Sequence, residues 1–121
     1  MARILISESS EDLARLLERM VIHLGHEPLL ARVPAPAQLQ DADVLVVEPA
    51  APAGAVIAQA ACLVNPALPI VCASVAAPPR ELAELGVQFA ATLVQPFTVA
   101  QLGTAIERVL RDRGAARRQS A

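Results

Sequence analysis

Two glutamates each follow a short run of apolar residues. Glu8 ends the segment Arg3–Glu8, and Glu48 ends the segment Asp43–Glu48. Runs of Val, Ile and Leu without polar alternation are typical of strands that are buried on both faces of a parallel sheet. The carboxyl ends of such strands form the edge where open α/β sheets bind their ligands. We therefore expect Glu8 and Glu48 to lie close together at this edge, where two carboxylates are a candidate cation site.

No lysine accompanies these carboxylates, because all ten basic residues of the chain are arginine. The formal net charge is −2, and the chain has two aromatic residues. Single-stranded nucleic acids are bound by basic grooves with aromatic stacking platforms, so this composition argues against a nucleic-acid partner. The local exception is a group of arginines near the C-terminus, which we interpret as a solvated end. This group comprises Arg111, Arg113, Arg117 and Arg118.

The composition fits one small cytoplasmic domain. A chain of 121 residues is long enough for a single hydrophobic core. Hydrophobic residues make up 55% of the chain, but much of this is alanine and no apolar run reaches the length of a membrane span. Cys62 and Cys72 lack CxxC spacing and suitable histidine neighbours. We therefore expect two reduced core residues rather than a metal site, as is typical of cytosolic proteins.

Apolar periodicity and turn residues predict five strand–helix units in succession. The expected strands are residues 3–8, a short strand around residues 29–31, and residues 44–47, 70–73 and 90–94. The expected helices lie within residues 9–24, 37–40, 55–64 and 78–85, and from Thr98 onward, where Gln101 completes a capping box. This succession predicts an α/β three-layer sandwich with helices on both sides of a parallel sheet. We expect a domain over residues 1–113 and a flexible basic tail over residues 114–121.

Several short motifs occur in a characteristic order along these elements. The first predicted strand leads into Glu8, and Glu48 is followed four residues later by Pro52. Ser74 follows the fourth predicted strand, and the segment Gln95–Phe97 follows the fifth. In these features the chain resembles the CheY-like receiver domain of bacterial response regulators.

The resemblance covers residues 2–112 and implies a fold as well as a site. The implied fold is flavodoxin-like, a five-stranded parallel sheet in the order 2-1-3-4-5, with a cis peptide bond between Gln95 and Pro96. Pro52 and Pro96 would be structural residues. In the family, an aspartate accepts a phosphoryl group, an acidic pair holds Mg²⁺, and a lysine pairs with the phosphate.

The chain departs from the family pattern at the positions that carry this chemistry. The positions of this degenerate phosphoacceptor pocket are Glu8, Ser9, Glu48, Ser74 and Gln95. Glu48 replaces the aspartate and is one methylene longer, Ser9 replaces an acid, and Gln95 replaces the lysine without supplying a charge. Thr92 stands at a switch position that is aromatic in the family. We therefore interpret the chain as a pseudo-receiver with no catalytic residues, no cofactor, and weak or absent Mg²⁺ binding.

Three functions are compatible with this interpretation. The first is an atypical receiver that acts in signal transduction through a protein partner, without aspartyl phosphorylation. The second is a divergent phosphorelay receiver that still accepts a phosphoryl group or binds Mg²⁺. The third is a small enzyme on a flavodoxin-like scaffold, which the lack of a glycine-rich phosphate loop and of a nucleophile elbow disfavours.

The resemblance also indicates where a partner or a second copy would bind. Receivers commonly pair through the face formed by the fourth helix, the fifth strand and the fifth helix. Charged residues of both signs on this face make it suitable for a homodimer or a partner contact. They are Arg80, Glu81, Glu84, Arg108 and Arg111. The rival surface is the outer side of the helix over residues 55–64, which has almost no polar residues.

Overall fold

The structure is a computed structural model that describes residues 1–50 and 52–120. The side chains at positions 52 and 117–120 lie outside the described part. The described residues form five strands and five helices in alternation. In chain order these are β1 (Arg3–Ser7), α1 (Glu11–His23), β2 (Glu27–Leu30), α2 (Pro36–Asp41), β3 (Val44–Val47), α3 (Pro52–Val64), β4 (Ile70–Ser74), α4 (Arg80–Glu84), β5 (Ala91–Val94) and α5 (Val99–Ser120).

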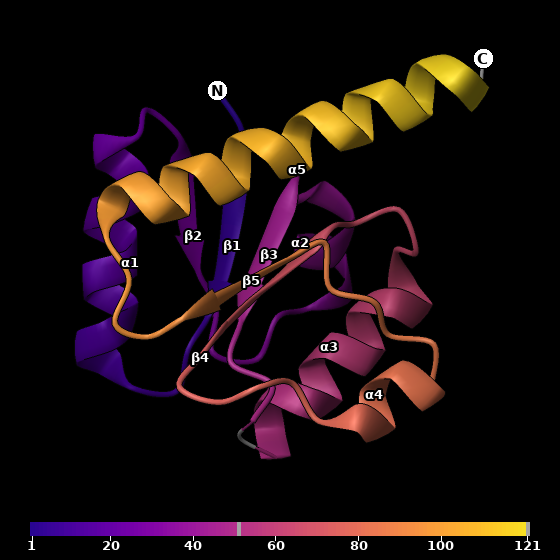
Figure 1. Ribbon diagram of the computed structural model, residues 1–121, viewed down its shortest axis with the longest axis horizontal. Coiled ribbons are helices and arrows are strands. Elements are labelled where there is room, and N and C mark those ends of the chain that lie inside the picture. The colour runs from indigo at the N-terminus through magenta and orange to yellow at the C-terminus, as the bar shows by residue number, and fades with distance from the viewer. Residues whose placement is uncertain (51, 121) are drawn as a thin grey trace.

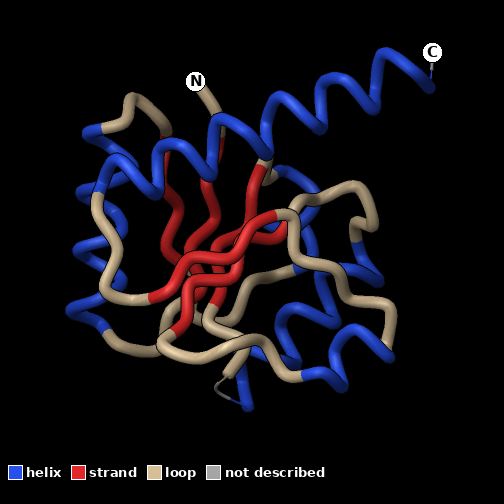
Figure 2. Tube along the Cα trace, viewed as in Figure 1, coloured by secondary structure: helices blue, strands red, loops and turns tan. Residues whose placement is uncertain are grey.

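The strands make one parallel sheet in the order β2-β1-β3-β4-β5, which confirms the predicted fold and topology (Figures 1 and 2). The three central strands are buried almost throughout, as their continuous apolar runs predict. Strand β2 has exposed residues, which fits its place at one edge of the sheet. All the strand ends that carry the predicted site therefore point to one edge.

Alternate residues of the central strands belong to two separate cores, one on each face of the sheet. Ile4 and Ile6 face α1 and α5, where they pack with a buried cluster that includes Leu102 and Ile106. Leu5 faces the opposite layer, where α2, α3 and α4 contribute Leu39, Ile57 and Leu82 respectively. Because successive strand residues point to opposite faces, a short buried strand can serve both cores.

Residues outside the helices fix several of the helix boundaries. The Ser10 hydroxyl accepts a hydrogen bond from the Leu13 N–H at 3.4 Å and caps α1, while Gly25 after its end has φ of 84°. At the start of α5, the Gln101 N–H donates to Thr98 Oγ1 at 3.1 Å and the Thr98 N–H donates to Gln101 Oε1 at 2.8 Å. The predicted capping box is therefore present.

Two helices differ in length from the sequence expectation. Helix α3 begins at Pro52, a few residues before the expected start, because proline suits the first turn of a helix. Helix α5 continues through Gly114 to Ser120, so the backbone of the arginine-rich end is helical (Figure 1). The flexibility of residues 114–121 stays a prediction. No helix of the described residues is long and apolar enough to span a bilayer.

Candidate functional site at the carboxyl edge of the sheet

Strand pairing brings the two glutamates to the same edge. In the parallel register of β1 and β3, Ser7 pairs with Val47, so Glu8 and Glu48 are the next residues on neighbouring strands. Val47 pairs in turn with Cys72 of β4, which places the end of β4 on the other side of Glu48. The predicted meeting of Glu8 and Glu48 at one edge is confirmed.

Three side chains of this edge make the same kind of local hydrogen bond. Glu8 Oε1 accepts from the Ser10 N–H at 3.1 Å, and Glu48 Oε1 accepts from the Ala50 N–H at 3.0 Å. Ser74 Oγ accepts from the Ala76 N–H at 3.2 Å. In each case the donor is the backbone two residues further along, so the side chain closes its own loop.

Gln95 reaches the same edge from the other side. Its amide Nε2 donates to the Ala73 carbonyl oxygen at 3.2 Å, and its backbone N–H donates to the Ser74 carbonyl oxygen at 2.9 Å. Gln95 thus lies beside Ser74, as the resemblance implies, but its donor is directed to the backbone of β4 and not to Glu48. Ser9 is exposed in the loop between β1 and α1.

The structural prolines and the switch position have different surroundings. The peptide bond between Gln95 and Pro96 is cis, as predicted. Pro52 is the first residue of α3, and its side chain lies outside the described residues. Thr92 pairs with Cys72 in the β4–β5 ladder and is exposed.

Two residues that shape this edge were missed by the sequence interpretation. Gly54 is buried in the first turn of α3, and a Cβ atom there would overlap the carbonyl oxygen of Glu48. Ser7, at the end of β1, donates from Oγ to the Arg32 carbonyl oxygen at 3.0 Å. The Gly54 signal was available in the sequence, because a glycine inside an apolar helix often marks a close backbone approach.

Burial of strand β4 below the carboxyl edge raises the pKa of the Cys72 thiol. Cys72 is fully buried in β4, and desolvation raises its pKa from 9.0 to about 11, with a smaller contribution from the negative charge of Glu48. Burial likewise raises the pKa of the Cys62 thiol. Both thiols are free, and neither is poised to act as a thiolate nucleophile.

The carboxyl edge offers few side chains that could bind a metal ion. Among residues 1–50 and 52–120, no three His, Cys, Asp or Glu side chains are grouped closely enough to hold a metal ion. A cation at this edge would have the carboxylates of Glu8 and Glu48 as charged ligands, with Ser9 as a neutral oxygen donor. One oxygen of each carboxylate, Oε1, already accepts the N–H group of its own loop, which leaves Oε2 as the uncommitted oxygen.

The five predicted interface residues are all exposed, on α4 and α5. The two helices lie on opposite sides of β5 in Figure 1. Helix α4 has only five residues, and a groove of about 360 Å³ runs between β5 and α5. Arg108 lines this groove together with Thr92.

Comparisons with known proteins agree with this architecture at the level of fold. No family model and no curated protein sequence matches the chain. A response regulator receiver domain protein from Clostridium thermocellum has a TM-score of 0.78 at 16% identity, over 96% of this chain and 99% of that chain. The Vibrio cholerae chemotaxis protein CheY4 has a TM-score of 0.75 at 25% identity, over 91% of this chain and 99% of that chain.

A longer protein also contains a similar unit. NtrX from Brucella abortus has a TM-score of 0.82 at 21% identity over 98% of this chain, which spans only 29% of the NtrX chain. The chain therefore has the fold of the CheY-like receiver domains of response regulators.

Proposed function

We propose that this chain is an atypical receiver domain that acts in signal transduction by binding a protein partner, without aspartyl phosphorylation. The observation that carries the proposal is the state of the acceptor position. Glu48 stands there in place of aspartate, and its carboxylate accepts a hydrogen bond from the Ala50 N–H. The nearby Gln95 supplies no positive charge and donates to the backbone of β4. A receiver fold with this edge keeps the scaffold without the reacting groups, so we propose no enzymatic activity.

No other aspartate is placed to accept the phosphoryl group in place of Glu48. Asp12 lies in α1, Asp41 ends α2, and Asp112 lies in α5. Asp43 precedes β3 at the opposite edge of the sheet, where its carboxylate accepts from the Arg3 N–H at 2.8 Å. None of the four follows the carboxyl end of a strand, which argues against the alternative of a divergent phosphorelay receiver.

We further propose that Mg²⁺ binds weakly or not at all. Magnesium requires near-octahedral oxygen ligands and is commonly held by one or two carboxylates with several waters. Glu8 and Glu48 have long side chains whose ordering costs conformational entropy, and one oxygen of each carboxylate already accepts a hydrogen bond from its own loop. Calorimetric titration with MgCl₂ should give a dissociation constant well above the micromolar range.

A phosphodonor experiment tests the proposal directly. The chain is incubated with acetyl phosphate or beryllium fluoride in the presence of Mg²⁺, then examined by intact mass and by amide NMR. We expect no mass increase and no shift of the amides around Ser74. The matched control is the triple variant Ser9→Asp, Glu48→Asp, Gln95→Lys. It introduces the second acid, the acceptor aspartate and the lysine of the family pattern. Stoichiometric acid-labile phosphate on the native chain would support the divergent phosphorelay receiver instead.

The proposed partner surface is the face formed by α4, β5 and α5. Exposed charges of both signs lie there, so two copies related by a two-fold axis could pair opposite charges. The single variants Glu84→Arg and Arg108→Glu each place like charges opposite one another, so they test this surface by light scattering or by pull-down of the partner. The outer side of α3 is the rival surface, since Val56 and Leu63 are 66% and 79% exposed. Association that survives both single variants but is lost in Val56→Glu would assign the contact to α3.

A further inference from the structure

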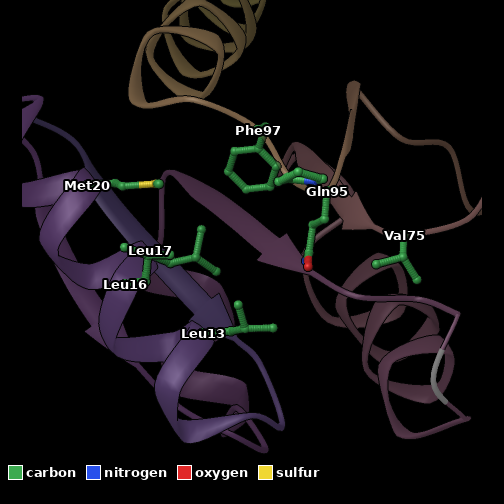
Figure 3. Close-up of a pocket in the computed structure, with 8 residues that line it drawn as sticks. Leu13, Leu16, Leu17, Met20, Val75, Gln95 and Phe97 are labelled. Atoms are coloured by element: carbon green, nitrogen blue, oxygen red, sulfur yellow. The ribbon is translucent and has the colours of Figure 1, made fainter.

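A cavity of about 300 Å³ lies between α1 and the loop that joins β5 to α5. Helix α1 contributes Leu13, Leu16, Leu17 and Met20, and the loop contributes Phe97 (Figure 3). Figure 3 also shows Val75, from the segment after β4, on the far side of the space. Three segments that are distant in sequence thus converge on one concave apolar surface.

Helix α1 has more apolar surface than the core uses. Leu17 is buried at 5% exposure, whereas Leu13 and Leu16 remain 37% and 47% exposed beside the cavity. Exposed leucines are common on protein surfaces when they are scattered singly. Here two of them line the same hollow as a buried leucine, a methionine and an aromatic ring, so they form a continuous lining.

One polar side chain enters this lining, and its orientation is determined by its partner. Gln95 Nε2 donates to the Ala73 carbonyl oxygen at 3.2 Å, and only the amide nitrogen can donate to a carbonyl. The amide oxygen is therefore the free end of the side chain, and Figure 3 shows it in the space between Leu13 and Val75. In the described part of the chain this oxygen accepts no hydrogen bond, so the cavity offers one acceptor.

The charges around the cavity indicate which ligand charge the site would favour. None of the residues that line the cavity is charged. Glu8 follows β1 at the edge of the sheet, and Glu11 and Asp12 occupy the first turn of α1, next to Leu13 in the sequence. These acids disfavour an anionic ligand such as a carboxylate or a phosphate.

We propose that this cavity binds a neutral apolar small molecule that donates one hydrogen bond to Gln95 Oε1. The volume of about 300 Å³ is at the lower end of the range for small-molecule pockets, which are typically apolar with a few polar groups. The ligand site does not depend on the proposed function, because phosphorylation enters at no step of it.

A set of matched naphthalene probes tests the proposal on the full 121-residue chain. The probes are 2-naphthol, which is neutral and donates one hydrogen bond; 2-methoxynaphthalene, which has no donor; and 2-naphthoate, which is anionic. Titrations are followed by methyl NMR of Leu13, Leu17 and Met20. We expect saturable shifts of these methyls with 2-naphthol, about fivefold weaker binding of 2-methoxynaphthalene, and the weakest binding for 2-naphthoate.

Two variants link the probe shifts to the cavity. Leu16→Arg places a charge in the lining and should abolish 2-naphthol binding, whereas Ile22→Arg, at a 59% exposed position of the same helix outside the lining, should not change it. Gln95→Met removes the acceptor and should equalise the affinities of 2-naphthol and 2-methoxynaphthalene. Dispersed amide spectra are required of each variant, and Leu16 is exposed enough for the first substitution to be compatible with folding.

Several results would overturn the proposal. It is wrong if none of the probes shifts the cavity methyls at millimolar concentration, in which case this surface is left for a protein partner. It is also wrong if Leu16→Arg leaves 2-naphthol binding unchanged, or if the shifts spread over the outer side of α1 around Ile22. Equal affinities of 2-naphthol and 2-methoxynaphthalene for the native chain would exclude the role of Gln95.

Discussion

The two edges of the sheet use polar side chains in different ways. At the carboxyl edge, Glu8, Glu48 and Ser74 each accept a hydrogen bond from the backbone two residues further along. At the amino edge, polar side chains connect segments that are far apart in sequence. Asp43 accepts from the Arg3 N–H, and Arg113 donates to the Asp43 carbonyl oxygen at 2.8 Å, 70 residues away.

A histidine makes a second long-range connection at the amino edge. His26 Nδ1 accepts from the Ala2 N–H at 3.1 Å, so the ring proton resides on Nε2. Nε2 lies 3.4 Å from Glu107 Oε1, which links the start of β2 to α5. Asn65 makes a further connection by donating to the Leu39 carbonyl oxygen at 3.0 Å.

The difference shows that side-chain hydrogen bonds hold distant segments together at the amino edge, whereas those of the two glutamates at the carboxyl edge are local. Two contacts at the carboxyl edge span longer separations, Ser7 to Arg32 and Gln95 to Ala73, but both acceptors are backbone carbonyls of adjacent segments. Among the described residues, the hydrogen bonds of the Glu8 and Glu48 carboxylates stay within their own loops, so these side chains can rearrange without breaking bonds to distant elements. The amino edge cannot, because its side chains bind β1, β3 and α5 together.

The largest loss of stability is expected from a substitution at Gly54, which lies under the carboxyl edge. A Cβ atom in Gly54→Ala would overlap the Glu48 carbonyl oxygen, so α3 must move away from the sheet. We expect a loss of about 3 kcal/mol in the free energy of unfolding, measured by urea denaturation, as is typical of overpacking a rigid contact.

Gly103→Ala is the matched control for this substitution. A Cβ atom at position 103 would meet Leu24 Cδ2 at 2.7 Å, which is the far end of a flexible side chain. Alanine also has a higher helix propensity than glycine, by about 0.8 to 1 kcal/mol. We expect a net change of about 1 kcal/mol or less. Equal losses in the two variants would show that Gly54 has no special role beneath Glu48.

The second largest loss of stability is expected from removing the Asp43 carboxylate, which connects distant segments at the amino edge. Asp43→Ala removes the acceptor of the Arg3 N–H and the carboxylate that lies 3.6 Å from Arg113, whose side chain is only 14% exposed. The loss of this carboxylate beside a largely buried guanidinium, together with the loss of the acceptor for the Arg3 N–H, should lower the free energy of unfolding by about 2 kcal/mol. Asp41→Ala, an exposed aspartate two residues earlier, should change it by about 0.5 kcal/mol or less.

These contacts also show which parts of the structure could be predicted from the sequence. The strands, their order and the edge shared by Glu8 and Glu48 were predictable, because apolar runs and turn residues act over short distances and the resemblance supplied the topology. The bond between Arg113 and Asp43 was not, since it depends on α5 crossing the amino edge, and the arginine had been interpreted as part of a solvated end. The local bonds of Glu8 and Glu48 depend on loop conformation, which residue types alone do not determine.

The third effect is a loss of stability at high pH that originates in the strand beneath the carboxyl edge. Burial raises the pKa of Cys72 from 9.0 to about 11, so the folded state holds the thiol proton more tightly than the unfolded state does. The resulting stability is fully present below pH 9 and is lost as the pH rises towards 11. The chain has no lysine and no tyrosine, so cysteines are the side chains that titrate in this interval.

We expect the free energy of unfolding to fall by about 1 to 2 kcal/mol between pH 8 and pH 11. Guanidinium denaturation at the two pH values measures this change. Cys72→Ala should remove most of the pH dependence, because the titrating group is absent. Cys62→Ala should retain most of it, since the Cys62 side chain is only partly buried. A pH dependence that survives in Cys72→Ala would assign it to a different group.

The smallest effect is expected from the polar side chains of the carboxyl edge, and it tests the comparison most directly. Glu8→Ala, Glu48→Ala and Ser74→Ala each remove one acceptor of an N–H group two residues away. The two loop donors next to the glutamates can turn to water, so each glutamate substitution should cost about 0.5 kcal/mol or less. Ser74 is fully buried, and its substitution should cost about 1 kcal/mol.

Urea denaturation of the combined Glu8→Ala, Glu48→Ala variant should give the sum of the two single changes, because each bond lies within its own loop. A coupling above about 1 kcal/mol would mean that the two carboxylates interact across the edge. The carboxyl edge would then be fastened like the amino edge, and the Glu8 and Glu48 loops would not move independently.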